Sequence, residues 1–179
     1  MRVLRFLSRA LLILGTIFIC GGLLIPSEWK VSRAITVHAS PEQIYPLVSN
    51  FQEWEKWSPW NSTQDASLHY QYEGPAAGVG AKQRWESKKM GKGSMQMTFA
   101  EPQQGIAYDL FINMGQSQSR LHGEIAFHPQ GEETRLTWTD QGNSGKHFGK
   151  RWMSLLIKTM LGKDMDKGLA DLKNQVEKG

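Results

Sequence analysis

Two side chains have the types and the spacing of a small metal site. His122 and Glu124 stand two residues apart in a segment that alternates polar and apolar residues, so in a β-strand both point to one face. Ile125 and Phe127 belong to the opposite, apolar face. His122 and Glu124 are therefore expected to face solvent, and we predict no metal site.

No other group of residues has the spacing of a catalytic set. No serine lies in a G-x-S-x-G elbow. Gly78 to Gly80 forms a GxG that no helix follows, which predicts a hairpin turn rather than a phosphate cradle. Cys20 is the only cysteine and lies in an apolar N-terminal run, which excludes internal disulfides and a cysteine nucleophile in the folded domain. We predict no catalytic residue and no cofactor.

The distribution of charge excludes a nucleic-acid interface. The formal net charge is +4, and Arg2, Arg5 and Arg9 contribute to it from the N-terminal end. Residues 30–179 hold 18 basic and 16 acidic side chains, without the basic stripe that a phosphate backbone requires. We therefore predict no nucleic-acid partner.

The last thirty residues predict a long amphipathic helix. From Phe148 to Val176, apolar side chains recur at steps of three and four among lysine, aspartate and asparagine. The apolar face of such a helix must pack on another element. Because the segments upstream resemble strands, that element is expected to be a sheet, which indicates an α+β domain. The apolar stripe consists of Trp152, Leu155, Leu156, Met160, Met165, Leu169, Leu172 and Val176.

Seven segments alternate apolar and polar residues as half-buried strands do. The first covers residues 31–38, and the others begin near Ser67, Ala81, Met95, Ile106, Leu121 and Leu136. One apolar face per strand is typical of an antiparallel sheet with one side in solvent. After the first strand, Ser40 and Pro41 predict the start of a short helix.

The N-terminus predicts a membrane anchor. Ala10 to Ile25 contains no charged residue and follows three arginines; as a helix it would span about 24 Å, against about 30 Å for a bilayer's hydrocarbon core. The positive-inside rule places the arginines inside and the domain outside. A cleaved signal peptide is the alternative, although no small-x-small site follows the run. We predict an anchor over residues 1–29 and a ligand-binding domain over residues 30–179.

Five segments, which follow one another along the sequence, together resemble the START-like (SRPBCC) superfamily, and within it the bacterial polyketide cyclase/dehydrase-type proteins. They are ASPEQIYPLVSNFQEWEKWSPW, YEGPAAGVGAKQRWE, KKMGKGSMQMT, TRLTWTDQG and LGKDMDKGLADLK. The likeness covers about residues 31–176 and implies a helix-grip fold, in which a curved seven-stranded antiparallel sheet surrounds the C-terminal helix. A mainly apolar cavity is expected between the two. Members of the family bind lipids, sterols, polyketides or other hydrophobic molecules, and only some of them catalyse a reaction.

The alternation within the strands selects the side chains that would line such a cavity. Apolar walls with a few polar groups suit a small hydrophobic molecule, although the same residues would equally make a closed core under the helix. The expected lining residues are Gln83, Trp85, Met95, Met97, Phe99, Tyr108, Leu110 and Trp138 from the strands, Trp57 and Trp60 at the mouth, and Trp152 and Leu156 from the helix.

These features favour a membrane-anchored protein that holds or transfers a hydrophobic small molecule or lipid. We expect a single-pass protein of the bacterial inner membrane with its domain on the extracytoplasmic side. The alternative is a cyclase- or dehydrase-like enzyme, which requires an acid or base in the cavity; Tyr108 is the one ionisable residue assigned inward. A third hypothesis is an interaction partner whose cavity is filled by its own side chains.

Overall fold

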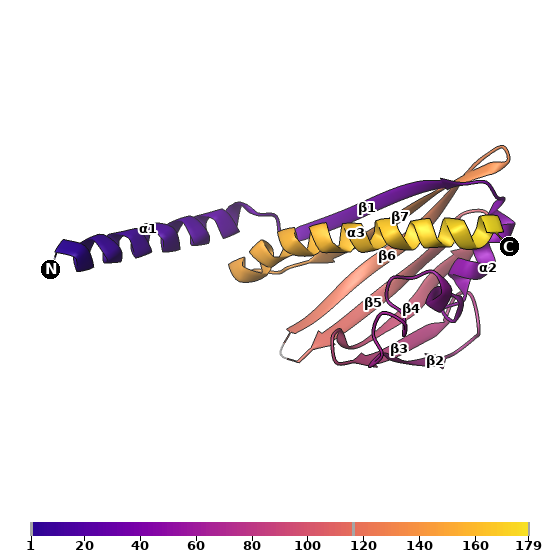
Figure 1. Cartoon of the computed structure of the whole chain (residues 1–179), viewed down its shortest axis with the longest axis horizontal. Helices are drawn as coiled ribbons and strands as arrows, with labels where there is room; N and C mark the ends of the chain where they lie inside the picture. The colour runs from indigo at the N-terminus through magenta and orange to yellow at the C-terminus, as the bar shows by residue number, and fades with distance from the viewer. Residues whose placement is uncertain (1, 116, 179) are drawn as a thin grey trace.

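A seven-stranded sheet forms the frame of the structure, a computed structural model that describes residues 2–115 and 117–178 (Figure 1). All neighbouring strands are antiparallel, in the order β1-β7-β6-β5-β4-β3-β2. The predicted strands are all present, although their ends differ by a few residues. The strands are β1 (Glu28–Val37), β2 (His69–Glu73), β3 (Lys82–Ser87), β4 (Gly91–Glu101), β5 (Gly105–Met114), β6 (Ser117–Gln130) and β7 (Glu133–Asn143).

The C-terminal helix α3 (Phe148–Lys178) lies across one face of this sheet, beside β1 (Figure 1). Arg33 Nε is 3.1 Å from Asp166 Oδ2, and Lys173 Nζ donates to the Thr36 carbonyl oxygen at 2.8 Å. Gly162 permits this closeness, because a Cβ there would lie 2.1 Å from Arg33 Nη2. The predicted α+β helix-grip arrangement is confirmed.

Two short helices close one end of the space between sheet and helix. The first, α2 (Pro41–Ser49), begins after Ser40 as predicted, and the Gln43 side chain accepts from the Ser40 backbone N–H at 2.9 Å. A 3₁₀ turn, η1 (Glu53–Lys56), then directs two tryptophans inward. Trp54 Nε1 donates to the Val48 carbonyl oxygen at 2.8 Å, and Trp57 Nε1 donates to the Leu47 carbonyl oxygen at 3.0 Å.

A bulge in β4 changes the expected alternation. The pairing with β5 shifts between Met97 and Phe99, so that Phe99 stands opposite Ala107 and Ala100 stands opposite Ile106. An extra residue in one strand reverses which side chains face the core. Phe99 is therefore exposed, and Ala100 packs against the core in its place.

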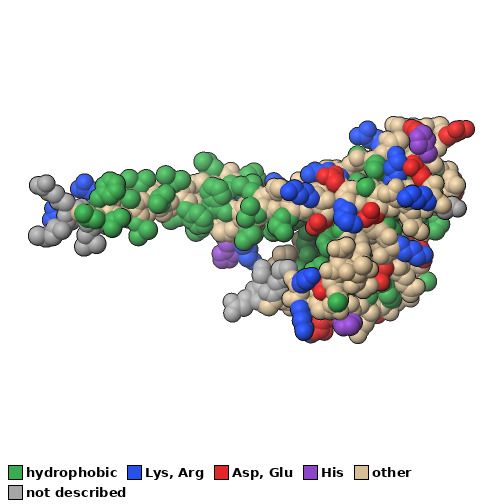
Figure 2. Space-filling view, viewed as in Figure 1, with side chains coloured by type: hydrophobic (Ala, Val, Ile, Leu, Met, Phe, Trp, Pro, Cys, Tyr) green, Lys and Arg blue, Asp and Glu red, His purple; other side chains and the backbone are tan. Residues whose placement is uncertain are grey.

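The N-terminal helix α1 (Arg2–Leu24) projects away from the domain (Figures 1 and 2). In the described part of the chain, Arg5–Leu24 is the one helix long and apolar enough to cross a membrane, and almost none of it is buried. The sheet begins at Glu28, and Trp29 is buried on β1. Glu28 and Trp29, which fall within the predicted anchor of residues 1–29, lie in the sheet.

The apolar stripe of α3 is covered over only half of its length. Met165, Leu169 and Leu172 are buried against the sheet. Leu156 and Met160, which the sequence pattern assigned to the same stripe, are 61% and 67% exposed, because the five-residue step from Met160 to Met165 turns them to another side of the helix. The amphipathic pattern thus describes two surfaces on one helix, and the sheet covers the C-terminal one.

Candidate functional site

A cavity of about 330 Å³ lies between α3 and the inner face of the sheet. It reaches from exposed side chains on α3, Ile157 and Met160, down to the fully buried Tyr108 and Asp140. Figure 2 shows a hollow with hydrophobic side chains beside α3. Cavities of about 300–1,000 Å³ with mainly apolar walls are typical of small-molecule sites. The apolar walls include Phe51, Trp54, Trp60, Trp85, Met90, Met95, Leu110, Ile112, Leu121, Ile157, Met160 and Leu161.

Three side chains form a hydrogen-bonded chain at the floor of the cavity. Trp138 Nε1 donates to Tyr108 Oη at 2.8 Å, and Tyr108 Oη donates to Asp140 Oδ1 at 2.8 Å. Trp138 and Asp140 share a face of β7 because they stand two residues apart. Gly123 lies opposite both Tyr108 and Asp140, and its missing side chain leaves the space in which they meet.

Burial determines the pKa values of the two ionisable side chains in this hydrogen-bonded network, Asp140 and Tyr108. It raises the pKa of Asp140 to about 6, even though the Tyr108 hydrogen bond and the nearby His122 act in the opposite direction. Burial, together with the negative charge of Asp140, raises the pKa of Tyr108 well above its usual value. Near neutral pH, Asp140 can therefore exchange a proton while Tyr108 retains its own.

Two polar atoms in the cavity wall have no hydrogen-bond partner among the described residues. They are Gln83 Oε1 and Trp85 Nε1, both fully enclosed. Gln83 and Trp85 lie on one face of β3, two residues apart, and both line the cavity. Both atoms have almost no accessible surface, so a ligand's polar group reaches them only when the neighbouring side chains move, and pairing would then remove the cost of leaving them buried and unpaired.

The structure brings half of the sequence-predicted lining residues together at the cavity. Trp60 lies at its side, Gln83 and Trp85 on β3, and Met95 on β4. Tyr108 and Leu110 come from β5 and reach the floor and wall.

The other half lie elsewhere, for identifiable reasons. Met97 and Trp138 are buried in the core next to the cavity, and Trp57 packs on Trp138 with ring centroids 5.6 Å apart. Trp57 is thus a core residue and not part of a mouth. Phe99 is turned outward by the β4 bulge, Leu156 lies on the exposed part of α3, and Trp152 stacks on Phe18 of α1.

Sequence reasoning missed several lining residues that carried the same evidence as those it selected. Ile112 and Leu121 follow the alternation of their strands, and Asp140 stands two residues after Trp138. Strand alternation was therefore sufficient to place Asp140 on the inner face. Tyr70 lies on the edge strand β2 and follows its alternation, whereas Glu55, Ser58 and Asp164 come from the turn region and the helix, where strand alternation does not apply.

The sequence also matches a known family over nearly the whole domain. The model of the family described as "Polyketide cyclase / dehydrase and lipid transport" matches residues 28–177. The chain belongs to this family. No curated protein matches the chain in sequence.

Solved structures of other proteins share the architecture of this polyketide cyclase/dehydrase-type domain. Protein CV1439 from Chromobacterium violaceum is 16% identical, with a TM-score of 0.59, and the match covers 83% of this chain and 96% of that one. Protein TTHA0849 from Thermus thermophilus is 17% identical, with a TM-score of 0.60 and coverages of 83% and 97%. At these identities the likeness concerns the fold alone.

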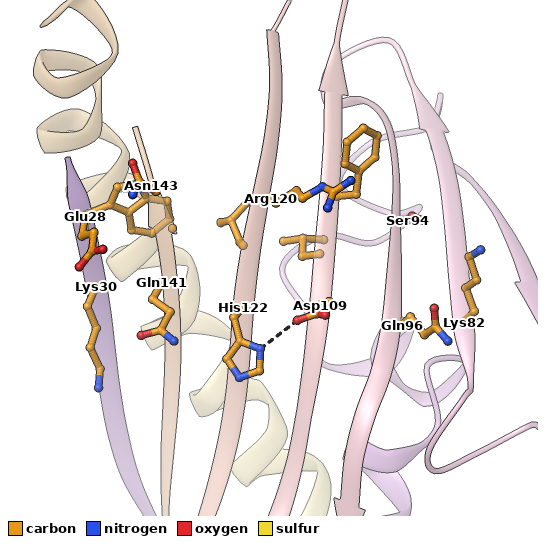
Figure 3. A pocket seen from close by; sticks show the side chains of 15 residues that line it. Glu28, Lys30, Lys82, Ser94, Gln96, Asp109, Arg120, His122, Gln141 and Asn143 are labelled. Atoms are coloured by element: carbon orange, nitrogen blue, oxygen red, sulfur yellow. Dashed lines mark hydrogen bonds and ion pairs between the residues drawn. The ribbon is translucent and has the colours of Figure 1, made fainter. Parts of the chain in front are cut away.

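A second, polar depression lies on the opposite face of the polyketide cyclase/dehydrase-type sheet. It measures about 870 Å³ and is lined by side chains such as Lys30, Lys82 and Arg120 (Figure 3). His122 Nδ1 lies 2.9 Å from Asp109 Oδ1 there, and Glu124 is exposed, as their strand positions predict. Because these side chains are open to solvent, this face offers a ligand little desolvation, and we assign the candidate site to the cavity under α3.

Proposed function

We propose that the domain binds one small hydrophobic molecule in the cavity under α3. The observation that supports this most is the pair of unpaired polar atoms, Gln83 Oε1 and Trp85 Nε1, inside otherwise apolar walls. Family membership supports the same class of ligand. An open cavity of about 330 Å³ argues against a core filled by its own side chains.

The two unpaired atoms suggest the chemistry of the ligand's polar group. Gln83 Oε1 accepts a hydrogen bond and Trp85 Nε1 donates one, and a neutral hydroxyl can pair with either. An anionic group fits less well, because Asp140 and Asp164 also line the cavity. A largely apolar molecule with a hydroxyl or similar neutral group therefore fits best.

We further propose that α1 anchors the domain in the membrane. The exposed apolar helix Arg5–Leu24 and the arginines that precede its most apolar part support a single span with the domain on the extracytoplasmic side. In a bacterial cell this would be the inner membrane.

A second candidate function is favoured by one observation, the buried Asp140 at the cavity floor. A carboxyl group with a pKa of about 6, bonded to Tyr108, has the protonation behaviour of a general acid or base. If the domain is an enzyme, Asp140→Asn protein should accumulate a bound molecule that wild-type protein does not carry. Mass spectrometry of the extracted molecules detects the difference, and identical molecules on both proteins would support the carrier function instead.

Replacing Gln83 tests the proposed binding site directly. Gln83→Leu keeps a similar volume and removes an unpaired buried acceptor, but it also removes the hydrogen bond between the Gln83 and Tyr70 side chains, so we expect the free energy of unfolding to change by no more than about 1 kcal/mol. The same change removes a ligand contact, and one neutral hydrogen bond of about 1 kcal/mol predicts roughly fivefold weaker binding. Native mass spectrometry of the full chain, extracted from its own membranes, measures the fraction that carries a bound molecule.

Gln96→Leu is the matched control, because Gln96 lines the polar depression on the outer face of the sheet. Wild-type and Gln96→Leu proteins should carry the same apolar molecule at equal occupancy. A wild-type protein without any bound molecule, even after addition of lipid extract, would refute the proposed function. Equal occupancy in all three proteins would refute the role of Gln83.

A further inference from the structure

The N-terminal half of α3 presents an apolar stripe that no other described element covers. Met153, Leu156, Ile157 and Met160 follow the spacing i, i+3, i+4 and i+7, so they line up on one side of the helix. All four are exposed. A contiguous exposed apolar surface of this kind marks an interaction site. We call these four residues the exposed stripe.

Helix α1 holds this half of α3 in a defined position. Trp152 stacks on Phe18 with ring centroids 5.9 Å apart, and Trp152 Nε1 donates to the Phe18 carbonyl oxygen at 3.0 Å. Gly21 and Gly22 make the contact possible, because a Cβ at Gly21 would lie 2.6 Å from the Trp152 ring.

Arg151 completes this joint between the two helices. Its Nη1 donates to the carbonyl oxygens of Leu23 and Ile25, at 3.2 and 3.3 Å. The last carbonyl groups of a helix lack partners within it, and an arginine there satisfies them. The joint therefore combines ring stacking, close packing on glycine and a charged cap.

The joint determines the depth of α3 relative to a bilayer that α1 crosses. Phe18 precedes the end of α1 at Leu24 by six residues, which corresponds to about 9 Å along a helix axis. The first turns of α3 then lie beside the last turns of α1, at the level of the headgroups and upper acyl chains. Tryptophan at position 152 suits this level, where aromatic residues are enriched.

The charge of this segment complements an anionic membrane surface. Residues 146–163 contain Lys146, Lys150, Arg151, Lys158 and Lys163 and no aspartate or glutamate. Basic residues beside an apolar stripe are typical of helices that bind anionic lipid surfaces. A second copy of the chain is a poorer occupant, because pairing two such segments would bring their basic residues together.

We propose that the exposed stripe docks on the anionic leaflet that α1 enters, so that the cavity opens directly onto lipid. Ile157 and Met160 belong to both the stripe and the cavity wall. A hydrophobic molecule can then pass between bilayer and cavity without crossing water. This proposal rests on the membrane anchoring and the cavity binding proposed above.

Depth-dependent fluorescence quenching tests the docking in the full chain. In a Cys20→Ser background, Leu156→Cys is labelled with an environment-sensitive fluorophore and the protein is reconstituted in nanodiscs that contain phosphatidylglycerol. Doxyl groups on the lipid acyl chains should quench this label at least threefold more than a label at Ala170→Cys. Ala170 is the matched control because it is exposed on the half of α3 that lies over the sheet. In neutral phosphatidylcholine nanodiscs the quenching at position 156 should decrease.

The outcomes distinguish a failure of membrane docking by the exposed stripe from a failure of ligand binding in the cavity. Equal quenching at positions 156 and 170, or efficient disulfide cross-linking of two chains through Leu156→Cys, would overturn the docking. Quenching that is unchanged in neutral lipid would overturn the role of the basic residues. A bound molecule without quenching refutes the docking alone, whereas quenching on a protein that never carries a molecule refutes the cavity function alone.

Discussion

Asp140→Asn is expected to stabilise the domain by about 3 kcal/mol at pH 8 and to leave its stability nearly unchanged at pH 4. The pKa of Asp140 is raised from 3.8 to about 6 in the folded protein, chiefly by burial. Each unit of pKa difference between folded and unfolded states corresponds to about 1.4 kcal/mol. Asparagine carries no charge at any pH and can still accept the Tyr108 hydrogen bond.

The direction of the pH dependence follows from proton binding. Between pH 4 and pH 6 the folded protein binds more protons at Asp140 than the unfolded chain does, so this group lowers the stability as the pH rises. Below pH 4 both states are protonated and the penalty is absent. Above pH 6 both states are ionised and the penalty is complete. The difference in stability between variant and wild type should therefore grow from pH 4 to pH 6 and then remain constant.

Denaturant unfolding of the full chain in detergent, at a series of pH values, measures this difference. Asp109→Asn is the control, since this change removes the same charge from the exposed outer face. Exposed ion pairs contribute about 0–1 kcal/mol, so its effect should be within that range at each pH. A difference for Asp140→Asn that does not change with pH would show that Asp140 is not held in the buried state described here.

Gly123→Ala is expected to destabilise the domain by about 4 kcal/mol. An added Cβ would lie 2.1 Å from Tyr108 Cζ and 2.4 Å from Asp140 Oδ1, so both side chains must move. Overpacking a core costs about 1–3 kcal/mol, and breaking a buried hydrogen bond costs about 1–3 kcal/mol more. Denaturant unfolding in detergent measures the loss.

Gly149→Ala provides the comparison for this glycine. Gly149 lies in the first turn of α3 with open space around it. Alanine there should leave the stability unchanged or raise it by up to about 1 kcal/mol, because alanine favours helix. If Gly123→Ala were as mild as Gly149→Ala, the close approach of Tyr108 and Asp140 at this position would be wrong.

The fold was largely predictable because its elements follow simple periodicities. Alternation located the strands, and the spacing of Met165, Leu169 and Leu172 located the helix face that the sheet covers. Alternation failed at Phe99, because a bulge depends on pairing between strands and leaves no mark on the period of one strand. Trp57 was misplaced because a 3₁₀ turn has neither strand nor α-helix periodicity.

The polar part of the cavity was less accessible to sequence reasoning. Asp140 shares the alternation of Trp138, yet a charged residue near the end of a strand resembles the start of a turn, and its meaning depends on Tyr108 from β5. The unpaired state of Gln83 Oε1 depends on everything that surrounds it in three dimensions. Likewise, one helical pattern was assigned to both halves of α3, although the five-residue step from Met160 to Met165 places the exposed stripe and the covered residues on different sides of the helix.

The joint between α1 and α3 also bears on how the proposed anchor matches the thickness of a bilayer. The uncharged run Ala10 to Ile25 spans about 24 Å as a helix, less than a hydrocarbon core of about 30 Å. A span that is too short normally thins the surrounding bilayer or draws flanking residues inward. Here Trp152 of α3 packs against Phe18, near the C-terminal end of α1, and adds apolar surface beside that end of the helix. Because Trp152 packs beside Phe18, within the run, it broadens the apolar surface without lengthening it, and the bilayer around the proposed anchor is expected to thin.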